Sequence, residues 1–346
     1  MATSTPVDIQ TPDDQRAAPA GESNARRLWA AASGWRAPLA LLLLVLFNIA
    51  FTENFVSAGA FNANLTQVAT IVIVAVGMTF VIATGGIDLS VGSLMGIAAV
   101  LAPLTMMRFI GAPVWLGLIL AIGLPILATG GCGLFNGALV TEIGLQPIIA
   151  TLVLYLAGRG IAQVLVNGEL IEFRNLGSPV VPPFEFIGLG SVFGVRVQIV
   201  LMVVIVFVAG WVLRATTFGR YMLATGGNPA AARLAGVPVK RVLLAVYVIS
   251  GLLAGLAGLI VATINQSSDP SQVGQFMELD AIAAVAVGGT PLTGGRATVL
   301  GTFIGALIIQ LLRFTLISHN IPDGIARVVI AAAIIVAVLL QRQRGS

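Results

Sequence analysis

Residues 214–241 read RATTFGRYMLATGGNPAAARLAGVPVKR and form the longest polar, basic interval between two strongly apolar stretches. This interval holds no acidic residue, and its five basic residues are Arg214, Arg220, Arg233, Lys240 and Arg241. Basic loops between membrane spans tend to stay on the cytoplasmic side. The stretch therefore predicts a helical membrane protein with this loop inside the cell.

The middle of the interval predicts a short capped helix over residues 229–235. Asn228 can accept backbone N–H groups as the N-cap, and Pro229 is tolerated at the first helical position. Gly236 fits a left-handed residue after the helix, and Pro238 prevents its continuation. Such a helix is about 10 Å long and unstable alone in water. It is either a solvated turn or a helix that docks against a cytoplasmic partner.

The composition is that of an integral membrane protein. The chain has 346 residues, of which 58% are hydrophobic and 9% charged, whereas soluble domains are about 25% charged. The apolar stretches are long enough for helices instead of barrel strands. The single Cys132 excludes an intrachain disulfide. One cysteine and one histidine give no dedicated metal site, no cofactor is expected, and the charge of +4 concerns membrane orientation, not nucleic acid.

The apolar stretches predict an all-α, polytopic transmembrane bundle of about ten spans. The spans are 37–52, 65–83, 89–107, 113–140, 147–166, 197–213, 242–264, 278–290, 297–318 and 323–340. Residues 278–290 are too short to cross about 30 Å of hydrocarbon, so this span extends upstream or belongs to a broken helix. Residues 1–30 predict a disordered cytoplasmic tail, and residues 31–346 the transmembrane domain.

The distribution of basic residues predicts that both termini are cytoplasmic. With ten crossings and the N-terminus inside, twelve of the 18 Lys and Arg residues fall on the inner side. Residues 167–196 then form the largest outer loop, with three glutamates and four phenylalanines. This loop either receives a partner protein or covers the bundle as a structural lid.

Two glycine-rich interruptions predict two weakly related halves with broken helices. Residues 84–93 read TGGIDLSVGS and residues 288–296 read GGTPLTGGR, in corresponding places of the two halves. Paired interruptions of this kind are typical of repeats around a transport pathway. The residues expected to line that pathway are Thr84, Gly85, Gly86, Asp88, Ser90, Gly288, Gly289 and Thr290.

Asp88 is the most informative single charge, because an ionisable residue at membrane depth is costly. It either N-caps a helix that starts at Leu89 or touches the transported solute. Glu278 and Asp280, at the start of the eighth span, invite the same capping interpretation.

The chain lacks the phosphate-binding loop of P-loop ATPases. That loop requires the motif GxxxxGK followed by Ser or Thr, whereas Lys240 is the only lysine and lies between Val239 and Arg241. The sequence therefore predicts a translocation subunit without its own ATPase site.

Three stretches together resemble the permease subunits of bacterial ABC sugar importers of the ribose/xylose/galactose type, which include galactofuranose and autoinducer-2 permeases. They are residues 76–93, 219–236 and 284–295, and the resemblance extends over about residues 37–340. It implies an inner-membrane location, a second permease copy or close homologue, a cytoplasmic ABC ATPase subunit and a periplasmic or lipid-tethered sugar-binding protein. The implied substrate is a neutral sugar whose identity the resemblance leaves open.

The resemblance also implies that the basic loop contacts the ATPase as a coupling helix. The residues concerned are Gly219, Arg220, Gly227, Asn228, Pro229, Ala230, Arg233, Leu234 and Gly236. Two alternatives remain open from the residues themselves. One is a branched-chain amino-acid-type ABC permease, which shares the architecture, and the other is a secondary carrier or channel that needs no ATPase.

Overall fold

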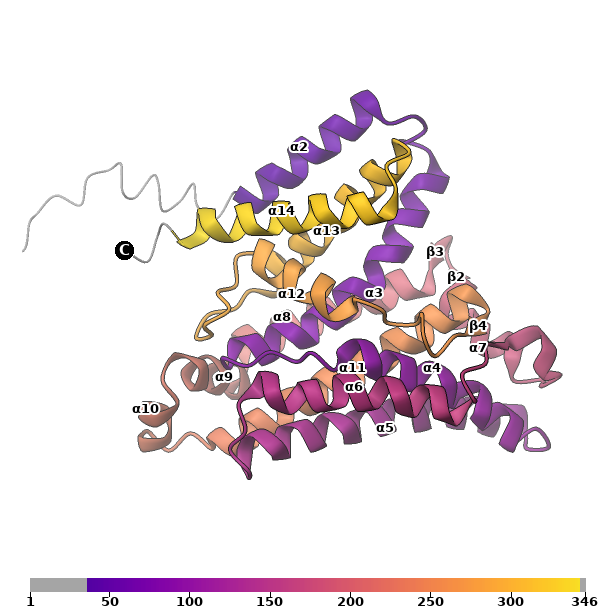
Figure 1. The fold of residues 1–346 in the computed structure, drawn as a ribbon, viewed down its shortest axis with the longest axis horizontal. Helices are drawn as coiled ribbons and strands as arrows, with labels where there is room; N and C mark the ends of the chain where they lie inside the picture. Colours follow the sequence, from indigo (N-terminus) through magenta and orange to yellow (C-terminus); the bar gives the residue numbers. More distant parts are fainter. Residues whose placement is uncertain (1–35, 343–346) are drawn as a thin grey trace, which may run out of the picture.

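The computed structural model describes residues 36–342 and shows a helical bundle with very short strands (Figure 1). The predicted tail, residues 1–30, lies outside the described residues. The helices are α2 (Arg36–Phe51), α3 (Ala58–Ala83), α4 (Val91–Arg108), α5 (Val114–Thr141), α6 (Pro147–Leu165), η1 (Phe173–Leu176), α7 (Val181–Leu189), α8 (Val197–Ala215), α9 (Thr217–Gly227), α10 (Pro229–Leu234), α11 (Val239–Asn265), α12 (Met277–Val287), α13 (Val299–Ser318) and α14 (Asp323–Arg342). The strands are β1 (Ile171–Glu172), β2 (Ser191–Val192), β3 (Val195–Arg196) and β4 (Ser267–Ser268), and β1 pairs with β4 and β2 with β3, both antiparallel.

The all-α prediction is confirmed, and each of the ten predicted spans corresponds to a helix. They are α2, α3, α4, α5, α6, α8, α11, α12, α13 and α14. Among the described residues, seven helices are long and apolar enough to cross a membrane. The largest difference is the start of α3, which begins at Ala58 instead of residue 65. The Ser57 side chain accepts a hydrogen bond from Ala60 N–H and fixes this earlier start.

The span predicted over residues 278–290 is a broken helix. Its 11 residues cover only about 16 Å at 1.5 Å per residue, roughly half of a hydrocarbon core. It does not extend upstream, because Gly274 and Phe276 have left-handed φ angles of 75° and 62°. Residues 269–276 therefore enter the bundle as a loop before α12 begins.

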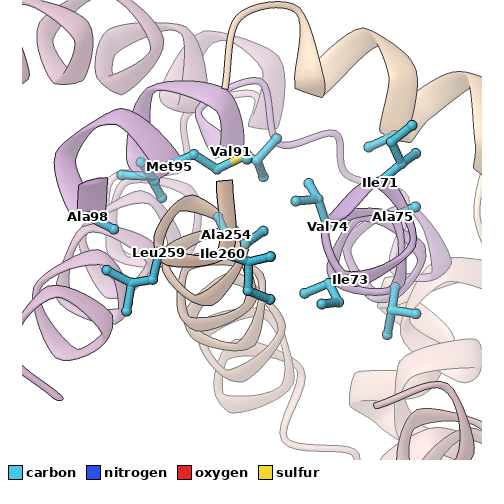
Figure 2. Close-up of a cluster of buried hydrophobic side chains, with 14 of the residues drawn as sticks. Ile71, Ile73, Val74, Ala75, Val91, Met95, Ala98, Ala254, Leu259 and Ile260 are labelled. Atoms are coloured by element: carbon cyan, nitrogen blue, oxygen red, sulfur yellow. The ribbon is translucent and has the colours of Figure 1, made fainter. Parts of the chain in front are cut away.

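Helix α3 forms the centre of the bundle. Every residue from Val68 to Ala83 is buried, and α3 contacts α8, α11, α12 and α13. A helix that is apolar on all sides belongs inside a protein or a membrane. Figure 2 shows Ile73 and Val74 of α3 pointing toward Ala254 and Ile260 of α11. On the other side of α11, side chains of α4 such as Met95 complete the same apolar cluster.

Helices α5 and α11 pack through glycines that lie four residues apart. A Cβ atom on Gly133 would overlap the carbonyl oxygen of Tyr247, and one on Gly251 would overlap that of Thr129. Small residues at such contacts allow two helix backbones to approach closely. The Gly133/Gly137 and Gly251/Gly255 pairs therefore serve packing within the bundle.

The two ends of the bundle differ in content. Figure 1 shows α9, α10, the start of α2 and the end of α14 at one end, and α7, β2 and β3 at the other. In the interval 167–196, the rings of Phe173 and Phe184 are buried and their centroids lie 5.7 Å apart. Helix α7 packs on α5, α8 and α11, so this part of the interval covers the bundle as a lid. Its glutamates Glu169 and Glu172 are exposed.

Candidate functional site

The first glycine-rich interruption separates α3 from α4 by a non-helical segment, residues 84–90. Helix α6 closes one side of this segment through Thr151. Its Oγ1 donates to the carbonyl oxygen of Ile87 at 3.2 Å and accepts from Leu89 N–H at 3.1 Å. Interrupted backbone at membrane depth must find such partners within the protein or in water. Here the partners are protein side chains.

Asp88 is fully buried in this segment, and both of its carboxylate oxygens accept hydrogen bonds. One oxygen accepts from Ser90 N–H at 3.0 Å and from Ser90 Oγ at 2.6 Å. The other accepts from Ser250 Oγ of α11 at 2.8 Å. Ser90 Oγ in turn accepts from Asn136 Nδ2 of α5 at 2.9 Å. The Asp88 cluster (Asp88, Ser90, Asn136 and Ser250) therefore joins the interruption to two other helices.

The prediction that Asp88 caps a helix starting at Leu89 is wrong in its register. Helix α4 begins at Val91, and Ser90 occupies the N-cap position without a capping side-chain bond. Asp88 instead makes a turn with Ser90, an arrangement that short polar side chains favour. The hydroxyl of Ser250 accounts for its second oxygen, and a local sequence pattern does not reveal this partner.

The second interruption joins α12 to α13. Thr290 is buried, and its Oγ1 accepts from Thr298 N–H at 3.3 Å. Gly288 faces α13, because a Cβ atom on it would overlap the carbonyl oxygen of Gly301. Gly289 is exposed with a φ of 89°. Gly288 and Thr290 thus pack within their own hairpin, and a role in the pathway for these residues stays a prediction.

The two interruptions meet, although they are more than two hundred residues apart in the chain. Gly295 N–H donates to the carbonyl oxygen of Ala83 at 3.0 Å, and a Cβ atom on Gly294 would lie 2.7 Å from Gly85 N. Gly226, at the end of α9, completes the contact, because its Cβ would overlap Ala83 O and lie 2.6 Å from Gly295 N. We call this set the glycine junction (Ala83, Gly85, Gly226, Gly294 and Gly295).

Helix α10 begins directly after the glycine junction, and its predicted caps are confirmed. Asn228 Oδ1 accepts from Ala230 N–H at 3.1 Å and from Ala231 N–H at 3.0 Å. Gly236 has a φ of 83°, which L-residues with a side chain resist. The helix ends at Leu234, one residue before the predicted end.

Most of the expected coupling residues lie on the surface. Leu234 is 92% exposed, an unusual environment for a large apolar side chain next to a charged one. The other exposed residues of the set are Arg220, Gly227, Asn228, Pro229, Ala230, Arg233 and Gly236. Gly219 is buried, and a Cβ on it would overlap the end of α8. Gly219 therefore allows the sharp bend between α8 and α9.

An exposed ion pair lies between α5 and α11. Lys240 Nζ donates to Glu142 Oε2 at 2.8 Å. This hydrogen bond lowers the pKa of the Glu142 carboxyl from its ordinary value. Lys240, in the first turn of α11, is thereby held by a protein side chain.

The contacts of two further groups of charged residues do not follow from the sequence pattern. Asp280 does not cap α12, where Phe276 is the N-cap residue; it binds Nη2 of Arg313 on α13 at 3.0 Å through both oxygens. Ionisable residues within two apolar spans favour such a pair, and this signal was present in the sequence.

Glu278 lies in the first turn of α12. It is 3% exposed and lies against Gly92 of α4. Arg159 of α6 donates to the carbonyl oxygens of Pro270 at 2.9 Å and Val273 at 2.7 Å. Arg159 therefore fixes the loop before α12, and Glu278 packs beneath that loop.

Comparison with known proteins gives one family and several relatives that match over most of their length. Residues 61–339 match the family model described as branched-chain amino acid transport system / permease component. The fructose import permease protein of Bifidobacterium longum is 37% identical over 88% of this chain and 86% of its own. The galactofuranose transporter permease protein of Escherichia coli is 38% identical over 81% and 79%. The ribose import permease protein of Escherichia coli is 37% identical over 88% and 92%. No solved structure matches the chain.

Proposed function

The chain belongs to the family of branched-chain amino acid transport system permease components, and from this we propose that it carries a monosaccharide across the inner membrane as the permease subunit of an ABC importer. ATP is hydrolysed by a separate cytoplasmic subunit, and a sugar-binding protein delivers the substrate from outside. The relatives support a sugar over an amino acid, since their names specify fructose, galactofuranose and ribose.

The observation that carries the proposal is the placement of α10. It is a capped helix with Leu234 92% exposed, and its base is the glycine junction between the two interruptions. A push on α10 is thereby passed from backbone to backbone, with no flexible side chain in between. Closely packed main chain is stiff and transmits displacement, which is the requirement for coupling ATP hydrolysis to membrane helices.

The proposed orientation places α10 and both chain ends in the cytoplasm. Helix α10, the start of α2 and the end of α14 lie at the same end of the bundle (Figure 1). The charged residues of the interval 214–241 are all basic and exposed, as the positive-inside rule requires. Arg233 then pairs with an acidic site on the ATPase through a charge-assisted hydrogen bond, and Leu234 fills an apolar groove on it.

The test compares Leu234→Glu with Phe193→Glu. Phe193 is also fully exposed but lies at the opposite end, in the turn between β2 and β3. Each variant is purified with the ATPase subunit and reconstituted with the binding protein. We expect Leu234→Glu to lose the ATPase on purification and to lower sugar uptake at least tenfold, whereas Phe193→Glu retains the ATPase. Equal ATPase retention in both variants would contradict the proposed role of α10.

Two further variants examine coupling without removing the apolar contact. Arg233→Glu reverses the charge, and Gly236→Val forces a β-branched residue into a left-handed conformation, a strain of about 1–3 kcal/mol. Both are expected to uncouple uptake from ATP hydrolysis while membrane insertion is retained. Full uptake with normal substrate-stimulated hydrolysis in both variants means that this loop is only a turn.

The same reconstituted system separates the alternatives. Competition by monosaccharides but not by leucine or valine distinguishes a sugar permease from an amino-acid permease. Uptake without any ATPase subunit would identify a secondary carrier or channel instead.

A further inference from the structure

A pocket of about 550 Å³ lies between α12, α13 and α14, apart from the glycine junction and the Asp88 cluster. Its size falls in the range of roughly 300–1,000 Å³ typical of small-molecule sites. The walls are mainly apolar, and the polar groups gather at a few positions. The lining residues that matter for the argument are Gln275, Phe276, Leu279, Asp280, Arg313 and Arg327.

The polar groups of the pocket are held in fixed positions. Asp280 and Arg313 form a two-bond ion pair at 3.0 Å, with 14% and 26% of their side chains exposed. The guanidinium of Arg327 lies 4.7 Å from the centre of the Phe276 ring, a cation–π contact. The pocket thus presents acceptor and donor groups beside an aromatic ring.

The pocket is open on one side, where Phe276 is 40% and Leu279 is 55% exposed. If this side faced lipid, three charged side chains would lie beside hydrocarbon, which is costly. An aqueous space on this side removes that cost. Charged residues of membrane proteins usually face such a space or the interior of the bundle.

We propose that the pocket between α12, α13 and α14 binds a neutral polyhydroxylated ligand between Asp280 and Arg313, with Phe276 beside it. The proposal rests on the proposed function and names the groups that recognise the sugar. A sugar hydroxyl can donate to the carboxylate and accept from the guanidinium at once, so it can bridge an ion pair that is already formed. The apolar face of a sugar ring suits the Phe276 ring, and Gln275 supplies a further donor and acceptor.

The first test asks whether the pocket faces water and ligand. Leu279→Cys is made in a Cys132→Ser background, together with Leu127→Cys, a matched control at an exposed apolar position in the middle of α5. The complex with its ATPase and binding protein is treated with a positively charged methanethiosulfonate in the nucleotide-free and ATP-bound states. We expect Leu279→Cys to react at least tenfold faster than the control in one state. Rates within twofold of each other in both states would overturn the proposal.

The second test separates ligand binding from structural support. Asp280→Asn keeps the shape of the side chain and removes its charge, and Glu142→Gln makes the same change in the exposed pair with Lys240. We expect Asp280→Asn to lower sugar uptake at least tenfold while ATP hydrolysis and Tm stay close to wild type, and Glu142→Gln to retain uptake. The proposal would be overturned if Asp280→Asn took up sugar within threefold of wild type. It would also be overturned if ATP hydrolysis and Tm fell together with uptake.

The two tests distinguish this inference from the proposed function. If the wild-type complex takes up no sugar, the proposed function fails, whereas the thiol reaction still reports whether the pocket faces water. If wild-type uptake is normal and the pocket variants match their controls, only the pocket proposal fails.

Discussion

The Asp88 cluster and the pocket between α12, α13 and α14 both contain a carboxylate inside the bundle, but they differ in what surrounds it. Asp88 is fully buried, and its carboxylate oxygens accept hydrogen bonds from Ser90 and Ser250. Asp280 has its partner Arg313 and also borders about 550 Å³ of open space. Asp88 is therefore enclosed by the groups that bond to it, whereas Asp280 borders the pocket in which we propose that a ligand binds.

This comparison predicts that tightly packed regions lose more stability on substitution than the pocket does. The glycine junction, which is packed through main-chain atoms, should be the most sensitive of them. Gly226→Ala places a Cβ against Ala83 O and Gly295 N, which are main-chain atoms that cannot rotate away. Overpacking usually lowers the free energy of unfolding by about 1–3 kcal/mol. We expect Gly226→Ala to lower it by about 3 kcal/mol or more. Gly227→Ala is the control, because its Cβ meets no described atom within 4 Å. Thermal unfolding of the purified variants measures the Tm of each. Equal Tm values for Gly226→Ala and Gly227→Ala would contradict the predicted sensitivity of the glycine junction.

Substitution of Asp88 should have the next largest effect. Asp88→Ala leaves the donors of Ser90 and Ser250 without their acceptor, and each unsatisfied buried group costs about 1–3 kcal/mol. We expect a total loss of about 2–4 kcal/mol. Asp88→Asn retains one acceptor oxygen and should lose about half as much. If Asp88→Ala keeps its Tm but abolishes uptake, then Asp88 is a ligand-binding group like those of the pocket.

The pocket pair should contribute less to stability than the Asp88 cluster. The side chains of Asp280 and Arg313 are partly exposed, so solvent screens the lost attraction when Arg313→Gln removes the charge. We expect the free energy of unfolding to fall by about 1 kcal/mol, a value between those for breaking surface ion pairs and buried ion pairs. Denaturation of Arg313→Gln and Asp88→Ala in the same detergent compares the two losses of unfolding free energy directly. A larger loss for Arg313→Gln would reverse the assignment of the two regions.

The exposed pair of Lys240 and Glu142 should show the smallest effect. Lys240 lowers the pKa of the Glu142 carboxyl, so the pair stabilises the folded state above the ordinary carboxyl pKa of about 4.3. The contribution is lost as pH falls through the lowered folded-state pKa. The Tm difference between wild type and Glu142→Gln should therefore be small at neutral pH, and vanish in acid and in roughly 1 M salt. A difference that persists in acid would contradict this account.

The sequence predicts the elements that depend on local signals. The ten spans follow from apolar length, and α10 follows from Asn228, Pro229 and Gly236, which act within a few residues of themselves. The glycine-rich interruptions also follow from the sequence. The contact between Gly295 and Ala83 does not follow from it. Such long-range contacts depend on how helices are stacked, which no local pattern encodes.

The same limit explains the misassigned carboxylates. Capping preferences are local, so a cap is one of the two interpretations that the sequence offers for Asp88, and it is the one that the sequence offers for Glu278 and Asp280. The actual partner of Asp280 is 33 residues away and that of Asp88 is 162 residues away. Pairing of ionisable residues between spans would have found Asp280 and Arg313, because both lie in apolar stretches. The Ser250 hydroxyl carries no comparable signal.

The central position of α3 also has a consequence for the synthesis of the chain. Thr79 of α3 shares a hydrogen bond with Thr302 of α13, 223 residues later. At about 5–20 residues per second, a ribosome needs roughly 10–45 s to make that interval. During this time the helices that finally surround α3 are still being made, and its apolar surface, with a mean hydropathy of 2.3, keeps it stable in lipid. The same side chains thus serve two solvents in succession, the bilayer of the growing chain and the interior of the finished protein.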